Sequence, residues 1–140
     1  MSTARDDLDD DLTRIGDLVP GPPLTIGETA TVADARRLLV QYRVPAIAVL
    51  GDRDELRGIV TRTDVLGADD LTAPIAGVMS MYLVAVRPGA SILRAAALLA
   101  CENIGQVIVI GADGSLLGIV GAADIARYFA MSAGSQVANP

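Results

Sequence analysis

The chain has 140 residues, of which 51% are hydrophobic and only 3% aromatic, so we expect a folded domain with an aliphatic core. The formal net charge of -6 and the pI of about 4.4 argue against nucleic acid as the main partner, because phosphate contacts need Lys and Arg. A single cysteine, Cys101, and the lack of histidine exclude an intrachain disulfide and any ordinary Ser-His-Asp or Cys-His catalytic arrangement.

The first segment, residues 1–14, carries an acidic run. Its members are Asp6, Asp7, Asp9, Asp10 and Asp11. The polar start is unlike a signal peptide, and no apolar run approaches the ~18 residues that span a bilayer, so we expect a cytoplasmic protein without a membrane partner. Leu8, Leu12 and Ile15 lie at helical spacing, which fits either a short helix that caps the core or a solvated tail.

An internal repeat begins at Ile15. A shift of the sequence by 60 positions places Ile15 on Ile75, residues 58–60 on residues 118–120, and Asp64 on Asp124. A constant offset of this kind indicates two copies of one supersecondary unit. We expect a first repeat over residues 15–67, a linker over 68–74, a second repeat over 75–130 and a C-terminal tail over 131–140.

The first copy predicts five elements in chain order. A short apolar strand at residues 24–26 precedes a helix that is capped by Thr31 and Asp34 and carries an apolar stripe over residues 32–42. A β-rich run at residues 46–50, a polar turn at 51–55 and a second β-rich run at 56–60 form a hairpin. A last helix begins near Asp64.

The second copy predicts the same order of elements. Its strands are expected at residues 83–86, 106–110 and 116–120, its first helix after the Ser91 cap, and its last helix near Asp124. The dipeptide Asp113-Gly114 favours a hairpin turn with positive φ. Each copy is therefore a β-α-β-β-α unit, and the fold class is α/β or α+β.

The first helix of the second copy is apolar nearly all round, since only Arg94 is polar between residues 92 and 101. Such a helix usually buries more than one face, and the second face would meet the neighbouring repeat or a second chain. The other interpretation is that its alanines are simply exposed. We expect a homodimer through this helix, and we expect Cys101 to be buried as a small hydrophobic residue.

The end of the first repeat suits a nucleoside phosphate. It reads Gly-Ile-Val-Thr-Arg-Thr-Asp over residues 58–64. A helix start presents free backbone N–H groups to an anion, Thr61 adds a hydroxyl, and an ionised Asp64 accepts two hydrogen bonds from a ribose diol. Thr and Asp are also ordinary helix caps, so the motif alone leaves both interpretations open.

Two such motifs, each ending a β-α-β-β-α repeat, resemble the CBS domain family, which is named after cystathionine β-synthase. The run Tyr-Arg-Val-Pro-Ala over residues 42–46 also resembles that family's approach to its second strand. The resemblance covers residues 15–129. It implies that the two CBS repeats pack sheet to sheet as one pseudo-twofold Bateman module, in which the motif of each repeat shares a cleft with strand entrances of the other.

The resemblance implies a main cleft and a weaker second cleft. The main cleft would consist of Thr61, Asp64, Tyr82, Val84, Ile104, Gly105 and Gln106. The second cleft would consist of Asp124, Leu24, Thr25, Val44, Pro45 and Ala46. In the second motif Gly121 stands where the first has Thr, so this cleft keeps the ribose acceptor and lacks a phosphate donor worth about 1.5–3 kcal/mol.

The resemblance implies a regulatory module that senses an adenine nucleotide of the AMP, ADP or ATP class, and not an enzyme. The alternative is a dimeric scaffold, or protein-interaction module, whose clefts are vestigial. An adenine nucleotide is the expected ligand, and an unidentified effector protein would be a further partner. No metal site is expected, because Asp52, Asp54 and Glu55 lie in a turn where solvated side chains are the simpler interpretation.

Overall fold

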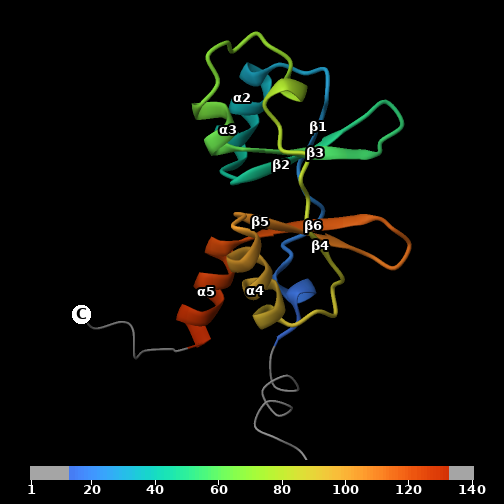
Figure 1. The fold of residues 1–140 in the computed structure, drawn as a ribbon, viewed down its shortest axis with the longest axis vertical. Helices are drawn as coiled ribbons and strands as arrows, with labels where there is room; N and C mark the ends of the chain where they lie inside the picture. The colour runs from blue at the N-terminus through green and yellow to red at the C-terminus, as the bar shows by residue number, and fades with distance from the viewer. Residues whose placement is uncertain (1–12, 133–140) are drawn as a thin grey trace, which may run out of the picture. The chain divides into compact units, whose positions relative to one another are not determined.

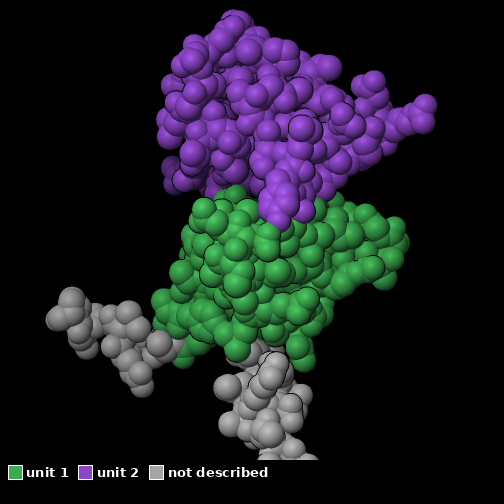
Figure 2. Space-filling model, in the orientation of Figure 1, with its two compact units in different colours: residues 1–22, 84–140 green, residues 23–83 purple. Residues whose placement is uncertain are grey.

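Two compact units make up the described part of the chain, residues 13–132 of a computed structural model (Figures 1 and 2). Unit 2 spans residues 23–83, and unit 1 combines residues 13–22 with residues 84–132. The acidic run, together with Leu8 and Leu12 of the expected capping helix, lies outside the described residues. Within residues 13–132, no helix has the length and hydrophobicity needed to cross a membrane. A cytoplasmic location remains a prediction.

Unit 2 is a three-stranded mixed sheet with helices on one side. Its strands are β1 (Thr25–Gly27), β2 (Ala46–Leu50) and β3 (Leu56–Thr61), with β1 parallel and β3 antiparallel to the central β2. The helices are α2 (Val32–Tyr42) and α3 (Arg62–Leu66), followed by the 3₁₀ turn η2 (Ile75–Gly77). In Figure 1 the β2–β3 hairpin turn points away from the two helices.

Unit 1 repeats this arrangement. Its strands are β4 (Ala85–Val86), β5 (Gln106–Ile110) and β6 (Leu116–Gly121), again with one parallel and one antiparallel pairing. The helices are α4 (Ile92–Glu102) and α5 (Ala122–Ser132), and the 3₁₀ turn η1 (Ile15–Leu18) belongs to the same unit. The expected strand order and the positive φ of Gly114 in the second hairpin are therefore confirmed.

Each unit takes its leading segment from the other repeat of the sequence. Ile15 is fully buried in the core of unit 1, where its amide donates to the Ala90 carbonyl at 2.8 Å. Ile75, one repeat later, is fully buried in unit 2 and donates in the same way to Ala30 at 2.8 Å. The compact units are therefore not the two sequence repeats, because the 3₁₀ turn that opens each repeat completes the opposite unit.

Two expectations about burial differ from the structure. The helix α4 buries one face only, through Ile92, Ala95 and Leu99, while Leu93 remains 44% exposed. Cys101 is exposed, so the prediction that it is a buried hydrophobic residue is wrong for the single chain. The two last helices also differ, since α3 ends before Gly67 after five residues and α5 continues for eleven.

Candidate functional site

The predicted ligand motif of the first repeat lies where β3 ends and α3 begins, and its two polar side chains bind each other. The Thr61 amide donates to Asp64 Oδ2 at 2.8 Å, and the Thr61 hydroxyl donates to the same oxygen at 3.0 Å. The Asp64 amide donates in return to Thr61 Oγ1 at 3.2 Å. These bonds form a capping box, so Thr61 holds the half-buried Asp64 carboxylate in one orientation.

Most of the backbone N–H groups that were expected to be free at this helix start already have acceptors. The Thr61 and Asp64 amides are used by the capping box, and the Arg62 amide donates to the Pro45 carbonyl at 3.3 Å. A capped helix start has already satisfied these three amides, so they are not available to a phosphate, and the phosphate site at this helix start stays a prediction. What remains is Asp64 Oδ1, which has no hydrogen-bond partner among residues 13–132.

The second motif keeps only part of this geometry. The Gly121 amide donates to Asp124 Oδ2 at 2.8 Å, as Thr61 does to Asp64, but there is no hydroxyl to add the other two bonds. Asp124 Oδ1 instead accepts from Arg127 at 3.2 Å, an ion pair within α5. Both oxygens of Asp124 are thus engaged, whereas Asp64 Oδ1 has no partner within the described residues. The i, i+3 spacing of Asp124 and Arg127 was the signal that sequence analysis missed.

The remaining predicted ligand residues group by unit. In unit 2, Ala46 pairs with Thr61 in the sheet, and Leu24 accepts a bond from the Ala48 amide at 3.0 Å. The residues predicted for the second cleft therefore lie in the same unit as the motif of the main cleft; they are Leu24, Thr25, Val44, Pro45 and Ala46. Thr25 and Pro45 are exposed, and Ala46 is buried.

Most of the other predicted ligand residues lie in unit 1, together with Asp124. Gln106 pairs with Gly121, the Gly105 carbonyl accepts from the Ala122 amide at 3.0 Å, and Val84 and Ile104 pack against the core. Tyr82, by contrast, belongs to unit 2 and is 60% exposed. The grouping of these residues into two clefts across the repeats stays a prediction.

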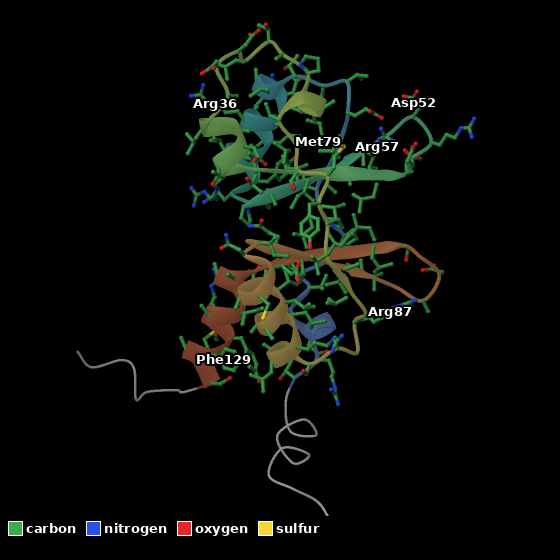
Figure 3. All side chains as sticks on the ribbon, viewed as in Figure 1. Arg36, Asp52, Arg57, Met79, Arg87 and Phe129 are labelled. Carbon is green, nitrogen blue, oxygen red and sulfur yellow. The ribbon has the colours of Figure 1, made fainter. Side chains whose placement is uncertain are left out.

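The turn carboxylates carry no sign of metal chemistry. Among residues 13–132, no group of three or more His, Cys, Asp or Glu side chains is arranged to hold a metal ion. Glu55 instead accepts from the Arg53 amide at 2.9 Å, and hydrogen bonds from its own backbone and from Arg53 lower the pKa of its carboxyl. Figure 3 labels Asp52 and Arg57 on this exposed hairpin.

Sequence analysis missed two surface grooves, one on the helices of each unit. The α2–α3 groove of unit 2 has a volume of about 380 Å³; its lining is Arg36, Leu39, Val40, Arg43, Arg62, Val65 and Leu66. The α4–α5 groove of unit 1 has a volume of about 410 Å³; its lining is Ala96, Leu99, Ala100, Ile104, Ala122, Ile125, Ala126 and Phe129. Adding 60 to the residue numbers of the first lining yields most of the second lining. The internal repeat was therefore the sequence signal that the two grooves are equivalent.

Comparison with known proteins agrees with this arrangement. The family model described as CBS domain matches the chain twice, over residues 15–70 and 75–131. The chain is 30% identical over 136 residues to the CBS domain-containing protein YhcV of Bacillus subtilis, covering 91% of this chain and 95% of that protein. It is also 30% identical over 106 residues, or 75% of its length, to inosine-5'-monophosphate dehydrogenase of Helicobacter pylori, but spans only 22% of that protein.

Solved structures share the fold at lower identity. The CBS domain pair of protein MJ0100, in complex with 5'-methylthioadenosine and S-adenosyl-L-methionine, has a TM-score of 0.79 at 22% identity and covers 86% of this chain and 98% of that one. The CBS domain protein PAE2072 of Pyrobaculum aerophilum, complexed with AMP, has a TM-score of 0.74 at 24% identity, covering 84% and 98%.

Proposed function

This chain belongs to the CBS domain family as a tandem pair, and we propose that it is a regulatory module that binds an adenosine ligand of the AMP, ADP or ATP class, rather than an enzyme. Adenosine is the chemical group that AMP, 5'-methylthioadenosine and S-adenosyl-L-methionine have in common in the complexes of similar fold. A shared fold does not establish a shared ligand, so the ligand of this chain has to be inferred from its own residues.

Asp64 Oδ1, which no residue of the described range 13–132 engages, is the observation that supports the proposal. A ribose has two neighbouring hydroxyl groups that donate, and an ionised carboxylate is an acceptor only. Asp64 Oδ2 is held by Thr61, which orients the carboxylate and leaves Oδ1 open for a donor. A group that is fixed before the ligand arrives loses little entropy on binding, which favours affinity. Asp64 is therefore the proposed ribose acceptor.

Thr61 has a second role in the proposal. Its hydroxyl proton is directed to Asp64 Oδ2 at 3.0 Å. A hydroxyl has one proton, so contact with a ligand phosphate requires this proton to turn away from Asp64. The ribose is then the main anchor and the phosphate the weaker one. The other members of the main cleft, Tyr82, Val84, Ile104, Gly105 and Gln106, and those of the second cleft stay predictions.

A ligand screen is the first test of the proposed function. AMP, ADP, ATP, NAD and S-adenosylmethionine are added one at a time while thermal unfolding of the chain is followed. A ligand present at 100 times its Kd stabilises the folded state by about 2.7 kcal/mol, which raises Tm by several degrees for a domain of this size. GTP is the control for the adenine ring. If no adenine compound at millimolar concentration changes Tm, the alternative function, a scaffold with vestigial clefts, replaces this proposal.

Titration calorimetry with the best ligand then compares the two motifs. Asp64→Asn keeps an oxygen for the helix cap and removes the charge, so we expect about a ten- to hundredfold loss of affinity. Asp124→Asn is the matched control and should affect only a weaker phase. Gly121→Thr should strengthen that weaker phase, because it adds the missing hydroxyl and φ of Gly121 lies outside the left-handed region. The added Cβ would lie 3.3 Å from the Gly105 carbonyl oxygen, so the gain requires that carbonyl to shift by a few tenths of an ångström. A larger loss for Asp124→Asn would contradict the assignment of the main site.

Homodimerisation is the second part of the proposal. The lining of the α4–α5 groove contains no charged side chain, its alanines leave room for a close helix approach, and Phe129 at its edge is 38% exposed (Figure 3). Apolar faces of this kind usually mark an interface, and a second copy supplies an equally uncharged face. Sedimentation should give twice the monomer mass of 14.4 kDa.

A matched pair of variants tests that interface. Ala100→Glu places a charge in the α4–α5 groove and should yield a monomer, because burying an unpaired carboxylate is costly. Val40→Glu places the same charge at the equivalent position of the α2–α3 groove and should leave the dimer intact. A wild-type chain that sediments as a monomer at micromolar concentration would overturn this part of the proposal.

A further inference from the structure

The carboxylate of Asp124 is engaged by its own helix, unlike that of Asp64. Its Oδ1 accepts from Arg127 Nη1 at 3.2 Å, and its Oδ2 accepts from the Gly121 amide at 2.8 Å. The Asp124 side chain is 34% exposed and that of Arg127 is 64% exposed, so the guanidinium lies on the solvent side of the carboxylate. Asp64 Oδ1 has no such partner among residues 13–132.

The last helices of the two units explain why only one motif has this cation. Arg127 lies one helical turn after Asp124, at i+3, and α5 continues to Ser132. The equivalent position after Asp64 is Gly67, which is the C-cap of α3 and has no side chain. A glycine cannot place a positive charge on the carboxylate. The two acceptors therefore differ in the residue three positions after each aspartate, as well as at the N-cap.

We propose that Arg127 is a specificity-determining residue, which weakens the binding of a ribose to Asp124 by engaging its outward oxygen. This inference rests on the proposed function, in which the carboxylate of each motif is a candidate acceptor for a ribose diol. A ribose hydroxyl can reach Asp124 Oδ1 only beside or in place of the guanidinium, and the carboxylate charge that would strengthen that bond is already balanced. The chain should therefore take its first adenosine ligand at Asp64.

The expected effect is modest, and it requires an uncharged probe. Breaking an exposed ion pair within a helix changes an equilibrium by about two- to fivefold. Adenosine is the appropriate probe, because it has the ribose diol and no phosphate. With AMP, the loss of an arginine also reduces the attraction to the phosphate, so the two effects would oppose each other.

The test follows adenosine binding by amide NMR, which reports the two motifs separately. The Gly121 amide donates to Asp124 and the Thr61 amide donates to Asp64, both at 2.8 Å, so each resonance follows its own carboxylate. Arg127→Met keeps a side chain of similar length and removes its charge and its donors. It should lower the adenosine concentration that half-saturates the Gly121 shift about two- to fivefold and leave the Thr61 response unchanged.

Three matched variants make this result specific. Arg127→Lys restores a cation and should bind adenosine as the wild type does. Arg94→Met removes an arginine of α4 that forms no ion pair with any residue in the range 13–132, and it should change neither response. Asp124→Asn removes the carboxylate. On that background Arg127→Met should have no further effect, because the arginine acts through the carboxylate.

The inverse variant places the same cation in unit 2. Gly67 has a φ of -83°, and an added Cβ would lie 3.4 Å from the Thr63 carbonyl oxygen, so a side chain fits there. Gly67→Arg should pair with Asp64 and weaken the adenosine response of the Thr61 amide about two- to fivefold. Gly67→Met fills the same space without a charge and should leave that response unchanged.

The outcomes separate this inference from the proposed function. An Arg127→Met chain that binds adenosine at Asp124 no better than the wild type would overturn the inference and leave the proposed function in place. A loss of AMP binding at Asp124 in the same chain, without a gain for adenosine, would also overturn it, because Arg127 would then be a phosphate ligand. If adenosine and AMP shift neither amide in any chain, both fail, since no ribose then competes with Arg127.

Discussion

The two units have the same backbone plan but differ in the chemistry of their helix starts and helix surfaces. In unit 2 both helices begin with a complete capping box, Thr31 with Asp34 and Thr61 with Asp64. In unit 1 the helix α4 has the Ser91 cap alone, and α5 begins after Gly121. The grooves differ in the same way, with arginines on one and alanines on the other.

This difference shows which positions specify the fold. Buried residues such as Val49 and Val109, or Ile15 and Ile75, are kept at equivalent positions and are fully buried in both units. Exposed positions have diverged, because substitutions there usually change stability by less than about 0.5 kcal/mol. A common core can therefore support two helix surfaces of different chemistry, one lined by arginines and the other by alanines.

The largest expected effects test whether the two cores are equivalent. Ile15→Ala and Ile75→Ala each remove a fully buried side chain from a leading segment, so each should lower the free energy of unfolding by about 2–5 kcal/mol. Urea denaturation measures both, with the exposed Val40→Ala as the control. A cost below about 1 kcal/mol at either position would show that the segment at that position is not part of a core.

A smaller difference is expected at two equivalent glycines. A Cβ at Gly58 would lie 2.5 Å from the Ser80 carbonyl oxygen, which is fixed by the hydrogen bond from Ile59 at 3.0 Å. A Cβ at Gly118 would meet the Val19 side chain instead, which can change rotamer. We expect Gly58→Ala to cost about 2–3 kcal/mol and Gly118→Ala about 1 kcal/mol. Thermal and urea unfolding of both variants measure this difference, and the reverse order would contradict it. Met79, beside Gly58, is labelled in Figure 3.

The smallest expected effect distinguishes the helix starts by pH. A hydrogen bond from the Thr31 backbone lowers the pKa of Asp34 from its ordinary value of 3.8, and the Thr31 hydroxyl and Arg37 contribute further. A lowered pKa means that this carboxylate stabilises the fold above pH ~4 and loses its effect as pH falls through the folded value. Asp34→Asn should therefore lower Tm slightly at pH 7, and the difference from wild type should vanish near pH 2. Arg94→Gln, at the equivalent position of α4, should show no such pH dependence.

Much of the fold could be predicted from the sequence because its determinants are local. Thr31 and Ser91 are both N-caps with side chains that accept from the third helical residue, as their positions before apolar stripes indicate. The Asp113-Gly114 turn forms because glycine accepts a φ of +84° at low cost. These features depend on a few neighbouring residues, and the 60-residue offset then transfers them from one repeat to the other.

The remaining features of the fold and the site could not be predicted, because they depend on contacts that the sequence alone does not reveal. The exposure of Cys101 follows from α4 having one covered face, which the composition of the helix alone cannot reveal. Asp64 and Asp124 could be identified as candidates, but their different hydrogen bonding depends on Thr61 in one case and on Arg127 in the other. The grooves require two helices to lie side by side, so no single motif predicts them.

The exchange of leading segments also determines the order in which a growing chain can fold. When residue 67 has been synthesised, the first repeat is complete in sequence, but unit 2 still lacks Ile75 and the Ser80 contact with Ile59. Unit 2 becomes complete only near residue 83. Residues 13–22 are made first and used last, because they pack on strands and helices that end at residue 132. On the ribosome, the core of unit 2 is therefore completed before that of unit 1, although unit 1 contains the described residues that are synthesised first.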